Sequence, residues 1–198
     1  MLLKVVVYVF AYLMGSIPTA YWYAKYFHGI DIRQHGSGNV GATNSLRVLG
    51  KKAGIIVLIF DLLKGLLPVL IARSLGFSEE QTFLIGIVCI LGHIWSVFAN
   101  FKGGKGIATS LGVILAVSPA GAGISLVVFV AIVYFTKYVS LASMLAGLAF
   151  VFYYLVFNYE QTNMSLIAFG LFMLLVFTHR ENIKRLVAGT ESKISSKK

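Results

Sequence analysis

The sequence predicts an all-α integral membrane protein, and three observations lead to that fold class. First, 58% of the 198 residues are hydrophobic and only 12% are charged, whereas a soluble domain averages ~25% charged residues. Second, a chain of this length has too little interior to bury so much apolar surface, so part of that surface must face lipid. Third, the apolar residues form runs that approach the ~20 residues a helix needs to cross a bilayer.

Seven apolar segments are expected to cross the membrane, within a single membrane domain over residues 1–198. The segments are roughly 3–24, 53–72, 82–100, 107–118, 121–136, 138–157 and 164–179. The fourth and fifth are short and form one uncharged run broken near Pro119. That run is either one long kinked helix or a hairpin of two short helices. Residues 192–198 read as a short basic tail.

The basic residues decide between the kinked helix and the hairpin. With the hairpin, every Lys and Arg except Lys4, Lys64 and Arg73 falls on one side of the membrane. The positive-inside rule makes that side cytoplasmic. We therefore expect seven passes in the cell inner membrane, with the N-terminus outside, the C-terminus in the cytoplasm and the active site on the cytoplasmic face. The net charge of +10 is thus explained by topology and by anionic ligands, and no nucleic acid is expected.

Three polar elements stand out on the expected cytoplasmic side. The first, within residues 25–52, is too long for a plain helix connection. Its glycines allow a ligand to approach the backbone closely. Thr43 or Asn44 is expected to cap a short helix that carries Arg47, and the N–H groups at such a cap form an anion site. A flexible interfacial loop is the alternative, but the density of Ser, Thr, Asn and Arg favours binding.

The second element is the run Phe-Lys-Gly-Gly-Lys-Gly at residues 101–106, directly before an apolar helix. Backbone N–H groups, a helix N-terminus and two lysines converge there, which favours phosphate binding. It is not a Walker A loop, because Gly106 follows the lysine where Ser or Thr is required. The alternative is a basic turn that only sets topology.

The third element, residues 179–189, is expected to continue the last helix beyond the membrane surface. His179 and Asn182 would then share one helix face. An amphipathic helix bound to anionic headgroups through its basic residues is an equally good interpretation, and the two are compatible.

Several polar residues fall in or at the ends of the apolar segments. Asp61 and Lys64 are three residues apart, and the cost of an isolated charge in the bilayer, ~3 kcal/mol, predicts that they pair. His93 is either structural or a ligand. Ser140 and Ser143 open the sixth segment, where either could act as a helix cap.

The expected site is rich in anion binders and poor in nucleophiles and bases. Cys89 lies in an apolar run, so it offers neither a disulfide nor an exposed thiol. Few carboxylates lie on the inner side, which argues against a metal site, and we expect no metal and no cofactor. Such a site suits a reaction between activated, anionic reagents, in which positioning and charge stabilisation do most of the work.

Four blocks of residues together resemble one family. They are Gly-Ser-Gly-Asn-Val-Gly-Ala-Thr-Asn-x-x-Arg (36–47), Asp-x-x-Lys-Gly (61–65), Gly-His with Phe-Lys-Gly-Gly-Lys-Gly-x-Ala-Thr (92–93 and 101–109), and His-Arg-x-Asn-Ile-x-Arg-Leu-x-x-Gly-x-Glu-x-Lys (179–193). In this order, over nearly the whole chain, they resemble the bacterial acyl-phosphate-dependent glycerol-3-phosphate acyltransferases, the PlsY family.

The resemblance implies transfer of a fatty acyl group from acyl phosphate to the 1-hydroxyl of sn-glycerol 3-phosphate. The products would be lysophosphatidic acid and phosphate, in the first acylation of phospholipid synthesis. Membrane lipid is an expected partner, and the enzyme that makes acyl phosphate is a candidate partner. Because acyl phosphate is already activated, no acyl-enzyme is expected, and a substrate phosphate could take the hydroxyl proton. His179 is the competing candidate for the base.

We assign the expected site residues to three groups. Those expected at glycerol 3-phosphate and the reaction are Arg47, Lys105, Ser143, His179 and Asn182. Those expected at acyl phosphate are Ser37, Gly38, Asn39, Thr43, Asn44, Lys102, Gly103 and Gly104, with the two glycine amides as oxyanion donors. Those expected in supporting roles are Asp61, Lys64 and His93.

Two other functional classes remain open at this point. An anion or phosphate-ester transporter would suit the charged pair at Asp61 and Lys64 and the helix dipoles, but it lacks a visible inverted repeat. A small lipid-binding membrane protein would use the glycine loops without turnover.

Overall fold

The computed structural model describes residues 2–194, which form helices joined by short connections, with no strand among them. The all-α fold class is therefore confirmed. The chain divides into two compact units, residues 1–117 and 118–198. Of the predicted basic tail, residues 195–198 lie outside the described part of the chain.

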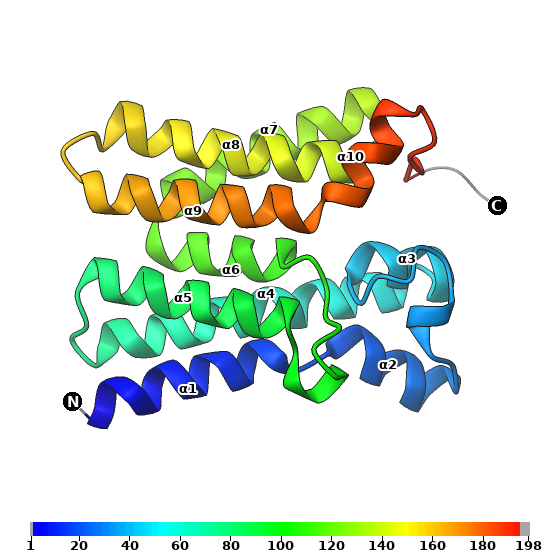
Figure 1. Cartoon of the computed structure of the whole chain (residues 1–198), viewed down its shortest axis with the longest axis horizontal. Coiled ribbons are helices and arrows are strands. Elements are labelled where there is room, and N and C mark those ends of the chain that lie inside the picture. The colour runs from blue at the N-terminus through cyan, green and yellow to red at the C-terminus, as the bar shows by residue number, and fades with distance from the viewer. Residues whose placement is uncertain (1, 195–198) are drawn as a thin grey trace. The chain divides into compact units, whose positions relative to one another are not determined.

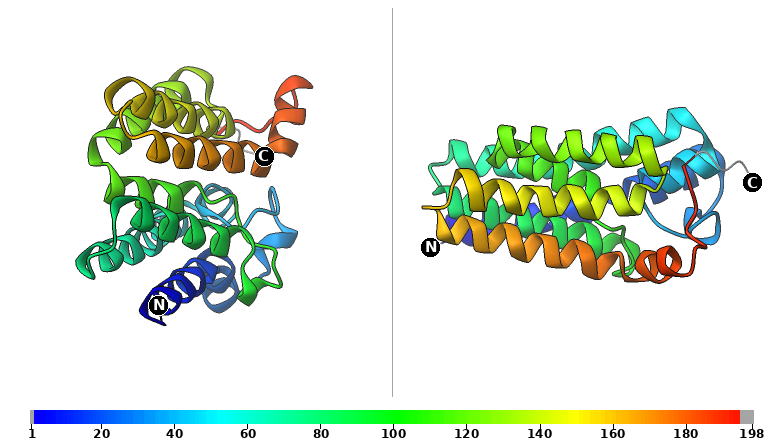
Figure 2. Two further views of the ribbon diagram at one scale, coloured as in Figure 1. Left: turned by 60° about the vertical axis from the view of Figure 1, so that its left-hand side comes forward. Right: turned by 90° about the horizontal axis from the view of Figure 1, so that it is seen from above.

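The first unit contains six α-helices. They are α1 (Leu2–Ser16), α2 (Thr19–His28), α3 (Ala42–Leu49), α4 (Lys51–Ser74), α5 (Glu79–Ile94) and α6 (Ile107–Val117), with 3₁₀ turns η1 (Ile32–Gln34) and η2 (Val97–Ala99). Helices α1, α4, α5 and α6 lie side by side, and α2 and α3 gather at one end of this group (Figures 1 and 2).

Small residues let these helices approach closely. A Cβ on Gly65 of α4 would overlap the Thr109 carbonyl of α6, and one on Gly112 would overlap the Leu62 carbonyl. Gly15 of α1 stands in the same relation to Cys89 of α5. Close backbone approach at glycine is the usual way in which membrane helices gain packing contacts, since lipid supplies no hydrophobic drive for helix association.

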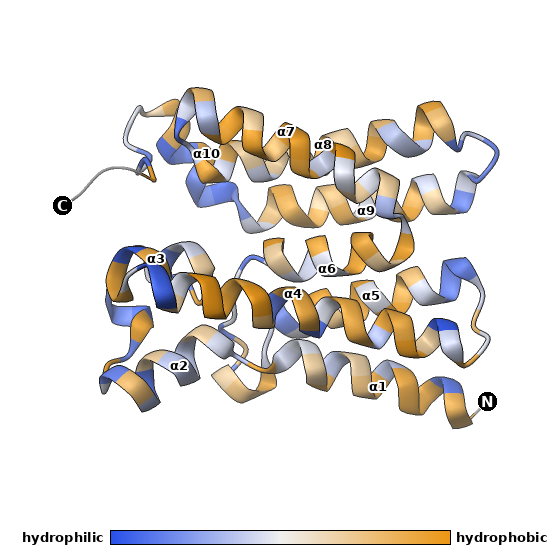
Figure 3. Ribbon diagram, turned by 180° about the vertical axis from the view of Figure 1, so that it is seen from behind, coloured by the Kyte–Doolittle hydropathy of each residue, from blue (hydrophilic) through white to orange (hydrophobic). Residues whose placement is uncertain are grey.

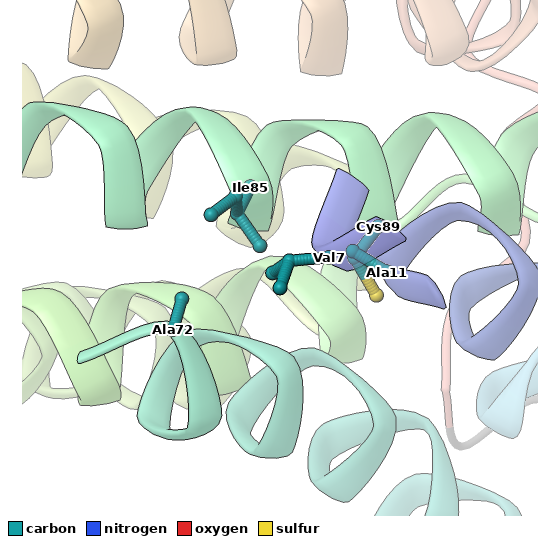
Figure 4. Packing of buried hydrophobic residues seen from close by; sticks show 5 residues of the cluster. All are labelled: Val7, Ala11, Ala72, Ile85 and Cys89. Carbon is teal, nitrogen blue, oxygen red and sulfur yellow. The ribbon is translucent and has the colours of Figure 1, made fainter. Parts of the chain in front are cut away.

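Figure 4 shows a buried cluster of small and branched side chains at the meeting of α1, α4 and α5. Its members are Val7, Ala11, Ala72, Ile85 and Cys89, all at most 5% exposed. The cluster holds three helices of the first unit together without any polar group except the thiol.

The first predicted segment, 3–24, is wrong as a single helix, because the chain breaks between α1 and α2 with a bend of 42°. Pro18 has no N–H, and its ring disfavours helical geometry at the preceding residue. Two carbonyls at the break find side-chain donors: Ser96 Oγ donates to Ser16 O, and Lys64 Nζ donates to Ile17 O at 2.7 Å. The break is thus held by residues of α4 and of the segment after α5.

A second proline lies inside α4 without ending the helix. Pro68 cannot donate to the carbonyl of Lys64, four residues earlier. The thiol of Cys89 lies 3.1 Å from that carbonyl and donates to it. The Cys89 thiol therefore supplies the hydrogen bond that Pro68 cannot donate within α4. This role agrees with the expectation that the thiol is not reactive.

The third predicted segment, 82–100, also differs from the structure. Helix α5 begins at Glu79, behind a capping box formed by Ser78 and Gln81, and ends at Ile94. The chain then turns through η2, and Asn100 and Phe101 adopt positive φ angles of 54° and 58°. The remaining predicted segments match the observed helices to within two residues.

The second unit contains four α-helices. They are α7 (Pro119–Thr136), α8 (Val139–Phe157), α9 (Thr162–Thr178) and α10 (Arg180–Val187). Helix α8 packs against both α7 and α9 (Figure 1). The expected straight continuation of the last helix is wrong: α10 is bent by 61° from α9 at His179.

Among the described residues 2–194, four helices are long and apolar enough to cross a membrane alone, and the number of possible spans rises to six if each bent pair is counted as one span. Helix α6 is apolar but has only 11 residues, or ~16 Å at 1.5 Å per residue. Figure 3 shows hydrophobic residues along the helices and hydrophilic ones at the helix ends and on α3. The structure thus supports four to six spans, while the seventh stays a prediction.

Candidate active site

The glycine loop, residues 36–41, is shaped by the side chain of Asn44. This buried amide donates to the carbonyls of Ile32 at 3.3 Å and His35 at 3.0 Å, and its Oδ1 accepts from the N–H of Ser37 at 2.9 Å. The expected capping role is wrong, because Gly41 is the N-cap residue of α3 and no side chain caps it. Asn44 therefore acts from inside the helix as a three-point brace for the loop.

Two glycines are required by this brace. Gly36 and Gly38 have φ angles of 63° and 70°, in the left-handed region that favours glycine. A Cβ at Gly36 would also overlap Asn44 Oδ1, and one at Gly38 would approach the Arg33 carbonyl to 3.1 Å.

The loop is preceded by a charged turn at η1. The carboxylate of Asp31 accepts from both the backbone N–H and the guanidinium of Arg33, with a shortest distance of 2.7 Å. These hydrogen bonds hold the pKa of Asp31 below its ordinary value, so the carboxylate stays ionised. The guanidinium also lies over the ring of Tyr21, 4.4 Å from its centroid, which anchors the turn on α2.

The lysine loop, residues 102–106, is built along the end of α5. The N–H of Gly103 donates to the Ile94 carbonyl at 3.0 Å, and the N–H of Gly104 donates to the His93 carbonyl at 3.1 Å. Both amides are expected at the acyl phosphate headgroup or the oxyanion, and in this structure both donate to carbonyls at the end of α5. The glycines are needed instead because a Cβ on either would overlap atoms of His93.

The glycine loop and the lysine loop meet at Gly104. A Cβ on Gly104 would lie 2.6 Å from the carbonyl oxygen of Val40, besides overlapping the His93 ring. Two segments that are 60 residues apart in sequence are therefore in direct contact, and no side chain larger than hydrogen fits between them.

Beneath this contact lies a buried polar cluster. Lys64 Nζ pairs with Asp61 Oδ1 at 2.8 Å, with side chains only 4% and 2% exposed, as the sequence predicts. Thr19 donates to the same carboxylate at 3.0 Å, and His93 Nδ1 lies 3.9 Å from it. The pair is thus part of the α1–α2 junction, and His93 connects it to the lysine loop.

The remaining expected residues of the first unit lie around these loops. Arg47 is exposed on α3, and Lys105 is half-buried one residue past Gly104. The other three are the exposed Lys102 and the half-buried Asn39 and Thr43.

In the second unit, Glu191 joins three segments. One carboxylate oxygen accepts from Ser140 at 2.7 Å and from Asn182 at 2.6 Å, and the other accepts from Arg185 at 2.7 Å. Burial opposes ionisation, but these donated hydrogen bonds and the Arg185 charge keep the pKa of Glu191 below its ordinary value of 4.5. Glu191 has no role among the expectations drawn from the sequence, although it stands in the last family-like block. Ser140 is expected there only as a possible helix cap, and Arg185 only as one of the basic residues of residues 179–189.

His179 and Ser143 are also buried in the second unit. His179 Nδ1 lies 2.8 Å from the Leu175 carbonyl, and because a carbonyl can only accept, Nδ1 carries the proton and Nε2 is the basic nitrogen. Ser143 donates to the Val139 carbonyl of its own helix at 2.8 Å. His179 is the N-cap residue of α10, and its carbonyl accepts from the N–H of Ile183 at 2.9 Å, so His179 and Asn182 lie in the same first turn beyond the bend.

The candidate site residues described above in each unit offer cations, amide groups and the imidazoles of His93 and His179, and neither Cys89 nor Ser143 is activated as a nucleophile. The thiol of Cys89 is buried in a helix pair, and the hydroxyls of Ser140 and Ser143 donate to oxygen atoms. Within residues 2–194, no three His, Cys, Asp or Glu side chains gather in a way that could hold a metal ion.

Apolar helices whose polar ends carry glycine loops and basic residues define an integral membrane protein that handles anionic ligands. The sequence model of the family described as glycerol-3-phosphate acyltransferase matches residues 5–189. The chain belongs to this glycerol-3-phosphate acyltransferase family.

Relatives agree with the family match over almost the whole chain. The chain is 48% identical over 194 residues to glycerol-3-phosphate acyltransferase 2 of Bacillus anthracis, covering 97% of this chain and 100% of the relative. It is 42% identical to glycerol-3-phosphate acyltransferase of Geobacter sulfurreducens, covering 99% of this chain and 100% of the relative.

Solved structures give the same answer. Crystal structures of PlsY, an integral membrane glycerol 3-phosphate acyltransferase, superpose in a glycerol 3-phosphate form with a TM-score of 0.91 and in a lysophosphatidic acid form with 0.88. Their sequences are 44% and 43% identical to this chain, with 96% of this chain and 94% of each PlsY chain covered. The resemblance seen in the four sequence blocks is thereby confirmed.

Proposed function

We propose that this protein transfers a fatty acyl group from acyl phosphate to the 1-hydroxyl of sn-glycerol 3-phosphate, releasing lysophosphatidic acid and phosphate. The family membership supports the assignment of the acceptor substrate, since crystal structures of PlsY are described as a glycerol 3-phosphate form and a lysophosphatidic acid form. The reaction is the first acylation of phospholipid synthesis. The transporter alternative is not favoured, because the named relatives are acyltransferases.

For the acceptor, Arg47 and Lys105 bind the phosphate of glycerol 3-phosphate. Both are long cations that stand next to the two loops, Arg47 in the helix braced by Asn44 and Lys105 directly after Gly104. Ser143, His179 and Asn182 orient the glycerol hydroxyls, since all three are buried polar side chains. Charge-assisted hydrogen bonds of this kind are the strong ones in phosphate recognition.

For the donor, the polar groups of the two loops bind the headgroup of acyl phosphate, while its tail lies against lipid-facing helices. The residues assigned to this role are Ser37, Gly38, Asn39, Thr43, Asn44, Lys102, Gly103 and Gly104. Within that set, Asn44, Gly103 and Gly104 act by giving the loops their shape, because their polar groups are engaged within the protein.

The mechanism is direct attack of the glycerol hydroxyl on the acyl carbonyl, with a phosphate oxygen of a substrate as the base. The new ester C–O bond forms, the anhydride C–O bond breaks, and phosphate leaves with the electron pair. Two of the candidate nucleophiles support transfer without an acyl-enzyme, because Cys89 is buried and the Ser143 hydroxyl donates to a backbone carbonyl. Lys102, assigned to the acyl phosphate headgroup, stabilises the negative charge as it moves to the leaving phosphate.

His179 is the competing base, because its Nδ1 faces the Leu175 carbonyl and its Nε2 is the basic nitrogen. The two assignments differ in the kinetics of His179→Ala. Loss of a general base lowers kcat by ~10²–10⁴-fold, whereas loss of an orienting group raises mainly the KM for glycerol 3-phosphate. We favour the second outcome.

The proposed topology has seven passes, with the N-terminus outside and the C-terminus and active site on the cytoplasmic side of the cell inner membrane. Two observations within the units support this grouping. The two loops meet at Gly104 in the first unit, and in the second unit the backbone N–H of Ile194 donates to the carbonyl of Lys137. Basic segments thus lie at one end of each unit.

The deciding experiment is turnover by the purified protein in detergent or lipid nanodiscs. Palmitoyl phosphate and labelled glycerol 3-phosphate are supplied with EDTA, and lysophosphatidic acid and phosphate are measured in equal amounts. Parallel reactions contain palmitoyl-CoA or acylated acyl carrier protein instead. Product from those donors but not from acyl phosphate would refute the donor assignment, and trapping of an acylated side chain would refute direct attack.

A further inference from the structure

His93 meets the lysine loop with both its backbone and its ring. Its carbonyl accepts the N–H of Gly104 at 3.1 Å, and its Nε2 stands so close to the Gly104 Cα that a Cβ there would overlap it. The side chain is only 6% exposed, so it cannot turn aside into solvent. The ring therefore fixes how far Gly104 lies from α5.

The opposite side of Gly104 touches the glycine loop. The carbonyl oxygen of Val40 would lie 2.6 Å from a Cβ on Gly104, and Val40 itself is 3% exposed. Gly104 is thus confined between the His93 ring and the backbone of the glycine loop. Any shift of the ring changes the spacing of both loops, and with it the position of Lys105, which follows Gly104 in the chain.

The other ring nitrogen faces the buried ion pair. His93 Nδ1 is 3.9 Å from Asp61 Oδ1 and has no hydrogen-bond partner among the described residues. Asp61 is itself held by Lys64 at 2.8 Å and by Thr19 at 3.0 Å. The ring is therefore backed by charged and polar groups that are fixed at the α1–α2 junction.

We propose that His93 is a positioning residue, whose Nε2 edge sets the junction of the glycine loop and the lysine loop and thereby the place of Lys105. It acts through these loops and does not contact substrate. The effect on catalysis rests on the proposed function, whereas the effect on loop order does not.

Two substitutions of His93 distinguish the contacts of its two ring nitrogens, because the amide of Gln and the shorter amide of Asn reach different positions of the imidazole ring. In His93→Gln the terminal amide reaches the place of Nε2 and keeps the contact with Gly104. In His93→Asn the shorter amide reaches the place of Nδ1, so the side facing Asp61 is kept and the loop contact is lost. His93→Ala removes both, and it replaces His93→Asn in the comparison if that variant does not fold.

The first measurement is steady-state kinetics on folded, monodisperse protein. We expect His93→Asn to lose up to ~100-fold in kcat/KM for glycerol 3-phosphate, as misplacement of a binding group by ~1 Å can do. His93→Gln should retain most of the wild-type value. A role confined to stability would leave kcat and KM of the folded enzyme unchanged in every variant, and that result would overturn the proposal.

The second measurement is hydrogen–deuterium exchange, which needs no turnover. Amides of Gly103 and Gly104 should exchange faster in His93→Asn and His93→Ala than in the wild type, and His93→Gln should match the wild type. Ile85→Ala is the control, since Ile85 is fully buried on the same helix, about two turns away. Equal exchange in His93→Asn and His93→Gln, or equal loosening by Ile85→Ala, would refute the proposal. A wild-type protein without acyltransferase activity would refute the proposed function alone.

Discussion

Several side chains in this protein form hydrogen bonds with more than one segment of the chain at once. Glu191 is the clearest case, because its two carboxylate oxygens accept hydrogen bonds from the start of α8 and from two positions on α10. Its side chain is 7% exposed, so the charge is stabilised by these donors more than by water. Arg185 supplies the opposite charge at 2.7 Å.

Replacing Glu191 by Gln should lower the unfolding free energy at neutral pH by ~1–3 kcal/mol, because Arg185 loses its charged acceptor. The sign of the pH dependence follows from the lowered pKa of Glu191. Its stabilisation is present above the unfolded value of 4.5 and is lost as the pH falls through the folded pKa. The difference between wild type and Glu191→Gln, measured by denaturant titration, should therefore shrink below pH 4.5. Glu160→Gln, at an exposed position, is the control.

Arg47 provides a second test at the scale of one residue. Arg47→Ala removes an exposed cation from α3 and leaves the Asn44 brace intact. We expect the KM for glycerol 3-phosphate to rise ~10-fold or more, as the loss of a charge-assisted contact implies, while the KM for acyl phosphate changes little. Lys51→Ala, an exposed lysine at the start of α4, is the matched control. Unchanged kinetics in Arg47→Ala would remove this residue from the acceptor site.

In the first unit, side chains donate hydrogen bonds to backbone carbonyls that have no partner within their own helix. The α1–α2 break exposes two carbonyls, and Ser96 and Lys64 satisfy them. Pro68 leaves the Lys64 carbonyl without a helix partner, and Cys89 donates to it. An unsatisfied backbone carbonyl in lipid costs several kcal/mol, so each of these side-chain hydrogen bonds stabilises the helix whose carbonyl it satisfies.

The ion pair between Asp61 and Lys64 at the α1–α2 break predicts that the losses in unfolding free energy caused by substitutions of the two residues are not additive. Asp61→Ala leaves Lys64 buried without its counter-charge and should cost ~3–5 kcal/mol, whereas Asp61→Ala combined with Lys64→Met should cost less than the single change. Unfolding in SDS and mixed micelles measures both. If the double variant loses the sum of the two single effects, the pair contributes no coupling energy.

The lysine loop makes a different prediction for Gly104→Ala. The new Cβ would meet the His93 ring and the Val40 carbonyl at once, so the two loops must separate and turnover should fall by ~100-fold or more. The helices should stay folded, as circular dichroism can check. Gly123→Ala is the control, because a Cβ at this position in α7 meets nothing within 4 Å. Normal turnover in Gly104→Ala would mean that the loop contact has no role in catalysis.

At the scale of the whole molecule, the distribution of basic residues supports the proposed orientation in the membrane. The connections 75–78 and 158–161 carry no Lys or Arg, whereas the segments 29–50 and 101–106 carry two each. If Lys and Arg were evenly distributed between the two sides, their charge would not favour one orientation of the protein in the membrane.

Single added cysteines can test this topology with the native Cys89 kept in place, because its thiol is buried. With Gln161→Cys, a membrane-impermeant maleimide should label intact cells, since the α8–α9 connection is expected outside. With Ser192→Cys, labelling should appear only after permeabilisation. Both positions are exposed in the structure. The reverse pattern would contradict the orientation, and labelling of both from outside would contradict the number of passes.

The helical membrane class, the family and most helix boundaries can be predicted from the amino-acid sequence, because hydrophobic length, charge asymmetry and ordered motifs are local properties of the chain. The pairing of Asp61 with Lys64 is predictable as well, since three-residue spacing in a helix brings them together. Three features required the folded structure: the Gly103 and Gly104 amides donate to α5 carbonyls, Asn44 braces a loop, and Glu191 joins α8 to α10. Those facts depend on which backbone groups are satisfied by distant segments, and no local pattern records that choice.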